Sequence, residues 1–244
     1  MCTLSHPCTI RVIAWTAKPL ALVMELCKHD LRQYYDKRDT FGYDLTTAVT
    51  IMLHAAQAMF YLHSTGLIHR DLKSMNIMVA ENMQGKVGDY GESRELDVNK
   101  TMTSTGTALW MAPEVSMSMR YDNKADCYSF GIILYEICER DLPFHDEEGI
   151  NGIGLAVKVA LKRKRPTVAE SWNEGLKDLM QECWKHEPSE RPAFSEIVRR
   201  LIGITEIISG TGSTTRFFKG TNDLGADTND LDAMVTTQKE GKGG

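Results

Sequence analysis

Several features that would mark a specialised class of protein are missing from this sequence of 244 residues. Its six cysteines form no Cys-x-x-Cys pair, and scattered cysteines favour reduced thiols over a disulfide framework or a metal site. No apolar run approaches the roughly 18 residues of a membrane-spanning helix, and no signal-peptide pattern opens the chain. Lysine and arginine (28) nearly balance aspartate and glutamate (33), so no overall charge attracts nucleic acid. We therefore expect a cytoplasmic protein without a membrane span or a nucleic-acid partner.

Hydrophobic periodicity indicates how the chain is organised. Two short apolar runs, Ile10–Trp15 and Pro19–Leu26, predict a two-stranded hairpin near the N-terminus. From Asp44, which we expect to be an N-cap, apolar residues recur with the spacing of one helix face. The segment 126–139 is apolar on nearly all sides, which is typical of a helix in the middle of a core. From about residue 209 the chain is rich in Gly, Thr and Asp with few large apolar side chains, which predicts a disordered tail.

Three motifs carry the chemistry. They read His-Arg-Asp-Leu-Lys-Ser-Met-Asn at 69–76, Asp-Tyr-Gly at 89–91 and Ala-Pro-Glu at 112–114. In residue type, order and approximate spacing they resemble the motifs of a eukaryotic protein kinase. Three later markers agree with this resemblance, which covers about residues 1–203: the segment 126–131, Cys-Trp at 183–184 and Arg-Pro at 191–192.

The resemblance implies an α+β, protein-kinase-like fold with a mostly helical C-terminal lobe. It divides the chain into residues 1–27, which would hold the last strands and the hinge of an N-terminal lobe, residues 28–205, which would form the C-terminal lobe, and residues 206–244, the disordered tail. It also implies an enzyme that uses ATP and Mg²⁺ to phosphorylate serine or threonine hydroxyls of a protein substrate.

The same resemblance assigns roles to four polar residues. Asp71 would orient the acceptor hydroxyl and accept its proton, and Lys73 would place a positive charge on the γ-phosphate. Asn76 and Asp89 would supply oxygen ligands for Mg²⁺, with Asn76 counted among the catalytic residues. Because the migrating phosphoryl group carries dispersed negative charge, its transfer depends on positioning and charge neutralisation. A solvated polar loop, the other interpretation, has no need of these residue types at this spacing.

On this alignment ATP would lie at the end of the predicted hairpin. Met24 would be the gatekeeper beside the adenine, and backbone groups of Glu25 and Cys27 would bond the adenine edge. Met78 would pack beneath the ring, and Asp89 would reach the phosphates through the metal. A methionine that only fills the core is the alternative for Met24.

The family pattern also implies supporting residues. Asp126 would hold the catalytic loop from the central helix, and His69 would be a packed core histidine. Glu114 and Arg191 would form a buried ion pair that clamps the activation segment to the helical lobe.

Acceptor class and regulation follow from a mixed set of markers. The residue types at Lys73 and Thr107 resemble those of serine/threonine kinases, whereas Trp110 and the pair 183–184 resemble those of tyrosine kinases. The tyrosine-kinase-like group of serine/threonine kinases combines both sets. The hydroxyl-rich region Thr101–Thr105 resembles an activation segment, which an upstream kinase or autophosphorylation would modify.

The glycine-rich loop, the Val-Ala-x-Lys lysine and the helical glutamate of a complete kinase are missing before His6-Pro7. Three hypotheses follow: a serine/threonine kinase whose N-terminal part lies outside this sequence, a non-catalytic lobe that acts as a binding or regulatory module, and an atypical enzyme that anchors ATP differently. An intact Asp71, Lys73, Asn76 and Asp89 favour the first. For the polypeptide as written we expect weak or absent activity.

Overall fold

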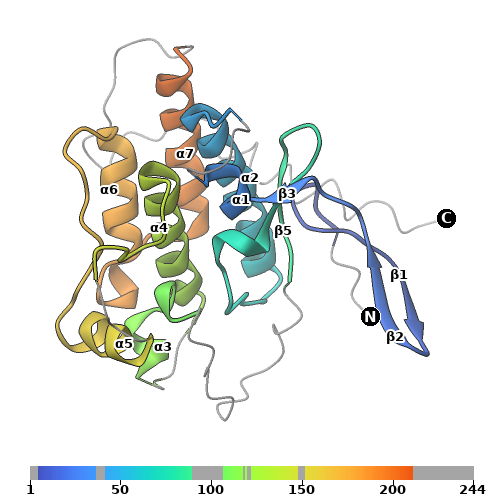
Figure 1. The fold of residues 1–244 in the computed structure, drawn as a ribbon, viewed down its shortest axis with the longest axis horizontal. Helices are drawn as coiled ribbons and strands as arrows, with labels where there is room; N and C mark the ends of the chain where they lie inside the picture. The colour runs from blue at the N-terminus through green and yellow to red at the C-terminus, as the bar shows by residue number, and fades with distance from the viewer. Residues whose placement is uncertain are drawn as a thin grey trace.

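A computed structural model describes residues 5–36, 42–89, 107–117, 119, 122–147 and 152–210. The fold is α+β: a mostly helical lobe carries one small sheet, and a two-stranded hairpin projects from it (Figure 1). The strands are β1 (Val12–Ala17), β2 (Leu20–Met24), β3 (His29–Asp30), β4 (Ile77–Val79) and β5 (Gly85–Val87). The α-helices are α1 (Leu31–Tyr35), α2 (Leu45–Ser64), α3 (Pro113–Ser116), α4 (Lys124–Glu139), α5 (Gly152–Leu161), α6 (Glu174–Cys183) and α7 (Phe194–Ile208), and the short 3-10 helices are η1 (Ser74–Asn76), η3 (Thr107–Leu109) and η4 (Pro188–Glu190).

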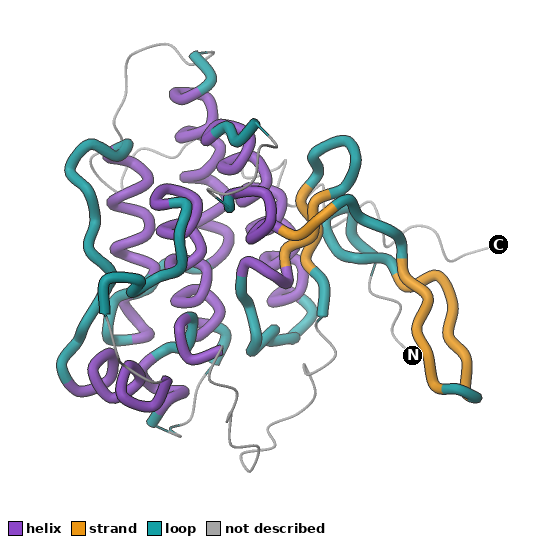
Figure 2. The backbone as a smooth tube through the Cα atoms, in the orientation of Figure 1, coloured by secondary structure: helices purple, strands orange, loops and turns teal. Residues whose placement is uncertain are grey.

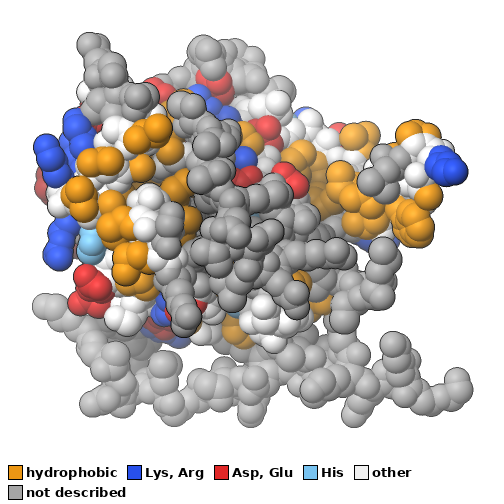
Figure 3. All heavy atoms as spheres, turned by 90° about the horizontal axis from the view of Figure 1, so that it is seen from below, with side chains coloured by type: hydrophobic (Ala, Val, Ile, Leu, Met, Phe, Trp, Pro, Cys, Tyr) orange, Lys and Arg blue, Asp and Glu red, His pale blue; other side chains and the backbone are white. Residues whose placement is uncertain are grey.

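The hairpin confirms the prediction made from the two apolar runs. Strands β1 and β2 pair antiparallel, with Trp15 opposite Leu22. All six residues of β1 are exposed, and Ile13 and Trp15 are 59% and 57% exposed. Because successive side chains of a strand point to opposite faces, the exposed Val12 and Ile13 show that both faces of the hairpin are apolar and uncovered by described residues. Figures 2 and 3 show the projecting hairpin and its hydrophobic surface.

A second, three-stranded antiparallel sheet joins the hairpin to the helical lobe. Strand β4 is central, between β3 and β5. The Ile10 N–H donates to the carbonyl of Val87 at 2.8 Å, and the Lys28 N–H donates to the carbonyl of Val79 at 2.8 Å. Both ends of the hairpin are therefore tied by backbone hydrogen bonds to this three-stranded sheet.

The core of the lobe is built around α4. Thirteen of its 16 residues are buried, as the apolar segment 126–139 predicts. Helix α4 packs against α6, and α2 packs against α7 and β5. Helix α2 begins after Asp44, whose carboxylate accepts the Thr47 N–H at 2.8 Å, so the predicted N-cap is confirmed.

Helix α2 alone among the described residues has the length and hydropathy that a membrane span requires. Nine of its 20 residues are buried within the lobe. A buried core helix passes the same length test, so this one helix is weak evidence for a membrane span.

The last helix ends close to the change in composition at about residue 209. Helix α7 ends at Ile208, three residues after the position 205 at which the resemblance ends the lobe. Ile204 is buried and Ile208 packs against the core, so apolar contacts extend to the end of the helix. Residues 211–244 lie outside the described residues, and the domain boundaries stay predictions.

Candidate active site

The predicted catalytic loop, which carries the motif at residues 69–76, follows α2. A carboxylate from α4 holds it in place. Asp126 accepts the backbone N–H groups of His69 and Arg70 at 2.8 and 2.9 Å, and it also bonds His63 Nε2 at 2.8 Å. Arg70 has a φ of 72°, in the left-handed region that costs energy for a residue other than glycine. The two hydrogen bonds from Asp126 offset this strain. The predicted capping role of Asp126 is confirmed.

His69 anchors the same loop from inside. It is buried, and its Nε2 lies 3.0 Å from the carbonyl oxygen of Gly88. The predicted packed histidine is therefore found, and it ties the catalytic loop to the segment that carries Asp89.

Three of the predicted catalytic residues are in direct contact. Lys73 Nζ donates to Asp71 Oδ2 at 2.5 Å. Asn76 Nδ2 donates to the backbone oxygen of Asp71 at 2.7 Å and to its Oδ2 at 3.2 Å. The other carboxylate oxygen, Asp71 Oδ1, is buried and has no hydrogen-bond partner among the described residues. One oxygen of Asp71 is thus fixed by two donors, and the second is left as an acceptor for a further group.

Asp89 is joined to this cluster through the backbone. The Gly88 N–H donates to the Asn76 carbonyl at 2.9 Å, and Asp89 comes next, exposed and with a φ of 57°. Among the described residues, the hydrogen bonds of the Asn76 side chain use its nitrogen, which leaves Oδ1 as the atom for a cation. An amide oxygen and an exposed carboxylate suit Mg²⁺, which prefers oxygen ligands and keeps several waters. No group of three or more His, Cys, Asp or Glu side chains forms a metal cage in the part of the chain that the structure describes.

The residues predicted to face the adenine lie where β2 leaves the hairpin. Met24 ends β2 and is 51% exposed. The Glu25 N–H donates to the Arg11 carbonyl at 3.0 Å, so the Glu25 carbonyl is the backbone group left for an adenine edge. Glu25 Oε1 accepts the Arg11 N–H at 2.7 Å and Lys86 Nζ at 3.2 Å. These contacts fix the start of the hinge against β5.

The segment after Cys27 pairs with the strand that carries Met78, whose partner in β3 is Asp30. The Lys28 N–H bonds the carbonyl of Val79, next to Met78 in β4. Cys27 is half-buried, and burial, with a smaller contribution from Glu25, raises the pKa of its thiol. Within the described ranges no hydrogen bond involves the Cys27 backbone N–H. That group is therefore available to a ligand, as the adenine hypothesis requires.

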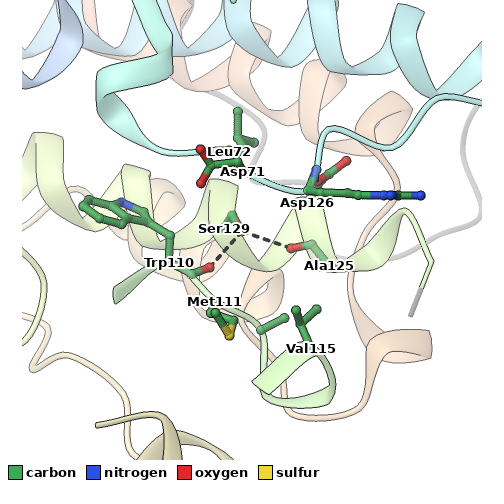
Figure 4. Close-up of a pocket in the computed structure, with 10 residues that line it drawn as sticks. Asp71, Leu72, Trp110, Met111, Val115, Ala125, Asp126 and Ser129 are labelled. Carbon is green, nitrogen blue, oxygen red and sulfur yellow. Dashed lines mark hydrogen bonds between the residues drawn. The ribbon is translucent and has the colours of Figure 1, made fainter. Parts of the chain in front are cut away.

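A pocket lies beside Asp71 (Figure 4). The Asp71 carboxylate and the Trp110 ring lie on one side of it, across from Asp126. Ser129 Oγ donates to the Trp110 carbonyl at 2.8 Å and to the Ala125 carbonyl at 3.2 Å, which fixes the pocket wall to α4. The residues that line it are Arg70, Asp71, Leu72, Trp110, Met111, Ala112, Val115, Ala125, Asp126 and Ser129.

The expected clamp between Glu114 and Arg191 is present. The guanidinium binds both carboxylate oxygens, at 2.6 and 2.8 Å, and both residues are buried. Arg191 also donates to the carbonyls of Lys124, Lys185 and His186. The wall of the pocket that carries Glu114 is thereby locked to the rest of the lobe.

Sequence reasoning missed one more buried carboxylate, Glu136, and its donors. Glu136 of α4 accepts hydrogen bonds from Tyr35, Ser74 and Trp110. Among the described residues it makes no ion pair. The one signal in the sequence is an acidic residue, Glu136, between the apolar residues Tyr135 and Ile137. Tyr90, Gly91 and the predicted phosphorylation region Thr101–Thr105 lie outside the described residues.

Comparison with known proteins agrees with this geometry. Residues 1–201 match the family model described as protein tyrosine and serine/threonine kinase. The chain is 38% identical over 202 residues to the serine/threonine/tyrosine-protein kinase HT1 of Arabidopsis thaliana, covering 81% of this chain and 51% of the relative. It is 35% identical over 215 residues to the dual specificity protein kinase shkE of Dictyostelium discoideum, covering 84% and 29%. It is 34% identical over 210 residues to the serine/threonine-protein kinase STY46 of Arabidopsis thaliana, covering 85% and 36%.

The chain spans about half the length, or less, of these curated relatives. The match to the family model nevertheless extends from the hairpin through α7, across every element that positions the catalytic loop. The chain belongs to the eukaryotic protein kinase family.

Proposed function

We propose that this site transfers the γ-phosphoryl group of ATP to serine or threonine hydroxyls of a protein. The observation that carries the proposal is the state of Asp71: one carboxylate oxygen is held by Lys73 and Asn76, and the other is buried without a described partner beside an open pocket. An acceptor hydroxyl in the pocket would find there an oriented acceptor for its proton.

Asp71 would act on the acceptor hydroxyl, and Lys73 would act on the phosphate of the phosphoryl donor. Their side chains are 16% and 18% exposed, so both remain within reach of a ligand at the edge of the pocket. When the γ-phosphate arrives, Lys73 is the cation that would bind it and reduce its negative charge. Asp71 would align the attacking oxygen and receive its proton as the new P–O bond forms. Positioning and charge neutralisation of this kind are the main contributions of a protein to phosphoryl transfer.

The residues present also suit a nucleotide with a divalent cation. Asn76 Oδ1 and Asp89 would hold Mg²⁺, which neutralises phosphate charge when bound. The Glu25 carbonyl and the Cys27 N–H would bond the adenine edge, with Met24 and Met78 packed against its ring. The free Cys27 N–H and the hydrogen bonds that fix Glu25 support this assignment.

The acceptor class is the finer part of the proposal. Lys73 two residues after Asp71 favours serine and threonine, and the names of the relatives include serine/threonine and dual-specificity kinases. We place the protein in the tyrosine-kinase-like group, with phosphorylation in the region Thr101–Thr105 as its means of activation, in the cytoplasm.

Labelled ATP tests the proposal. The full chain is incubated with Mg²⁺, [γ-³²P]ATP in less than stoichiometric amount and a mixed peptide library, and the labelled amino acid is identified after hydrolysis. Because the sequence predicts at most weak activity for these 244 residues, we expect a low level of label, placed on serine and threonine. The label should be lost when EDTA removes Mg²⁺ or when Asp89→Ala removes a metal ligand. Glu81→Gln, an exposed carboxylate in the turn before β5, is the matched control and should leave transfer unchanged.

A chain that binds neither ATP nor Mg²⁺-ATP by calorimetry would contradict the proposal. It would favour the non-catalytic binding module, in which the loop residues have no ligand to hold.

A further inference from the structure

A single buried carboxylate joins the two walls of the site. Glu136 has no exposed surface, and its oxygens accept hydrogen bonds from three different elements. Oε1 accepts Ser74 Oγ–H at 3.1 Å and the Tyr35 hydroxyl, and Oε2 accepts Trp110 Nε1–H at 2.7 Å. Ser74 directly follows Lys73, and Trp110 lines the acceptor pocket. The catalytic loop and the pocket wall therefore share one acceptor.

Glu136 differs from the other buried glutamate of the lobe. Glu114 is neutralised by two hydrogen bonds to Arg191, whereas the three donors to Glu136 are neutral groups. Burial of a carboxylate without a paired cation is costly. The positive charge of Arg32 in α1 acts on Glu136, and the Arg32 guanidinium lies over the Tyr35 ring at 5.1 Å. A neutral side chain would suit a purely structural position better, so the retained charge points to a use.

The donors also determine what happens when Glu136 takes up a proton. An indole N–H can only donate, so Oε2 must stay unprotonated to keep Trp110. The proton then resides on Oε1, where the hydroxyls of Ser74 and Tyr35 can accept it. The hydroxyl that accepts this proton turns its own O–H away from Oε1, and the oxygens of Tyr35 and Ser74 lie 3.2 Å apart, so each can donate to the other. Protonation thus rearranges the hydrogen bonds around Ser74 at the catalytic loop and leaves the bond at the pocket wall in place.

We propose that Glu136 is a positioning residue that couples the catalytic loop to the acceptor pocket. It contacts the loop through Ser74 and the pocket through Trp110, and its protonation state determines how the two are placed relative to each other. This inference rests on the proposed function for its effect on transfer, but the coupling itself needs no ligand. The titratable and charged groups that face Glu136 are Tyr35 and Arg32, both from α1; Ser74 and Trp110 are neutral.

The protonation behaviour of the group supports the proposal. Burial raises the pKa of Glu136 to about 7, against the opposing effect of its three donors. Burial and the adjacent Glu136 also raise the pKa of Tyr35, which keeps its hydroxyl protonated. Both states of Glu136 are therefore populated near neutral pH, whereas Tyr35 stays a donor.

The first test observes Trp110 directly and requires no phosphoryl transfer. The indole N–H resonance of Trp110, assigned with Trp110→Phe, is followed in the full ¹⁵N-labelled chain from about pH 5 to about pH 9. We expect it to shift with a midpoint near neutral pH, and to lose this shift in Glu136→Gln, whose amide reproduces the protonated arrangement. Ser74→Ala should move the same resonance although Ser74 does not donate to Trp110.

The second test measures the acceptor side of the reaction. In single-turnover transfer we expect Glu136→Gln to lower kcat/KM for the acceptor peptide by about tenfold or more, since small misalignment is costly, with ATP affinity within about twofold of the wild type. Tyr128→Phe is the matched control, because it removes a buried hydroxyl of the same helix that makes no hydrogen bond among the described residues, and it should lower kcat/KM by less than about threefold. Ser74→Ala and Trp110→Phe are then combined. In the chain that keeps Glu136, their effects on kcat/KM should not add up to the effect of the double variant, whereas in the Glu136→Gln background they should.

The outcomes separate the two proposals. An indole resonance that ignores both pH and Ser74→Ala in the folded chain overturns the coupling, and so do additive effects of the two substitutions with Glu136 present. Absence of ATP binding by the wild type, with an indole resonance that responds as expected, overturns the proposed function and supports the coupling. Ser74→Ala keeps the buried carboxylate, so the test survives if Glu136→Gln fails to fold.

Discussion

The hairpin and helix α4 use similar apolar residues in opposite ways. Every residue of β1 is exposed, whereas thirteen of the sixteen residues of α4 are buried. Trp15 on the hairpin is 57% exposed, and Trp184 in the helical lobe is 5% exposed. Composition alone therefore does not tell which apolar segment stabilises the fold. Burial does, because apolar side chains contribute to stability through the area they remove from water.

The difference in burial indicates that the helical lobe provides the stability of the fold and that the hairpin is only attached to it. The helical lobe holds the core, the catalytic loop and both buried glutamates. The hairpin is attached to it by backbone hydrogen bonds at Ile10 and Lys28 and by the ion pair of Glu25 with Lys86. We therefore expect substitutions in the lobe to change global stability and substitutions in the hairpin to leave it nearly unchanged.

The largest effect is expected at the buried ion pair of the lobe. Arg191→Met leaves Glu114 buried without its cation, which should lower the free energy of unfolding by about 3–5 kcal/mol. Urea denaturation followed by circular dichroism measures the loss. Arg199→Met is the matched control, because its pair with Glu196 is exposed and should be worth less than about 1 kcal/mol. Equal losses in the two variants would contradict the account.

A second expected effect is a pH dependence that Glu136 gives to the lobe. Its pKa is 4.5 when unperturbed and about 7 in the fold, so the folded chain binds this proton more tightly than the unfolded chain. Its contribution to stability is therefore fully present below about pH 4.5 and is lost as the pH rises through 7. Glu136→Gln should remove this component, so the stability of the variant relative to the wild type should improve between pH 4.5 and 7. A difference that does not change with pH would refute the assignment.

A smaller effect is expected at the start of α2. Asp44→Ala removes the acceptor of the Thr47 N–H and hydroxyl and should cost about 1 kcal/mol. Asp44→Asn keeps a capping oxygen and should cost less. Urea midpoints of the two variants check the order, and an alanine variant as stable as the asparagine variant would show that the cap does not matter.

The smallest effect is expected on the hairpin. Trp15→Ala should change the free energy of unfolding of the lobe by less than about 0.5 kcal/mol, as an exposed substitution does. Trp184→Ala changes the same residue type within the core and should cost about 3–5 kcal/mol. Thermal unfolding of both variants sharpens the comparison, and a Trp15→Ala loss above about 1 kcal/mol would show that the hairpin is part of the stable unit.

The sequence predicted those parts of the fold and site that local patterns or family motifs encode. The hairpin, the N-cap at Asp44, the α4 core helix, the support from Asp126 and the Glu114–Arg191 pair are all present in the structure. Each rests on spacing within one segment or on a motif with a defined partner. The roles of Asp71, Lys73, Asn76 and Asp89 stay predictions, although the first three are in contact.

The role of Glu136 could not be predicted because its partners are distant in the sequence. Tyr35 precedes it by 101 positions and Ser74 by 62, and no local pattern links a buried carboxylate to a hydroxyl so far away. The end of α7 also depends on contacts that a local pattern does not show. Contacts of Ile204 and Ile208 with the core, rather than composition, decide where that helix stops.

The most direct measurement compares single-turnover phosphoryl transfer by the wild-type chain and by Asp71→Asn at saturating Mg²⁺-ATP. The substitution keeps the shape of the side chain but removes the free carboxylate oxygen that receives the proton. We predict transfer slower by about 10²-fold or more, with ATP affinity unchanged because Asp71 is assigned to the acceptor. Equal transfer rates for the two proteins would contradict the central claim that Asp71 orients the acceptor hydroxyl.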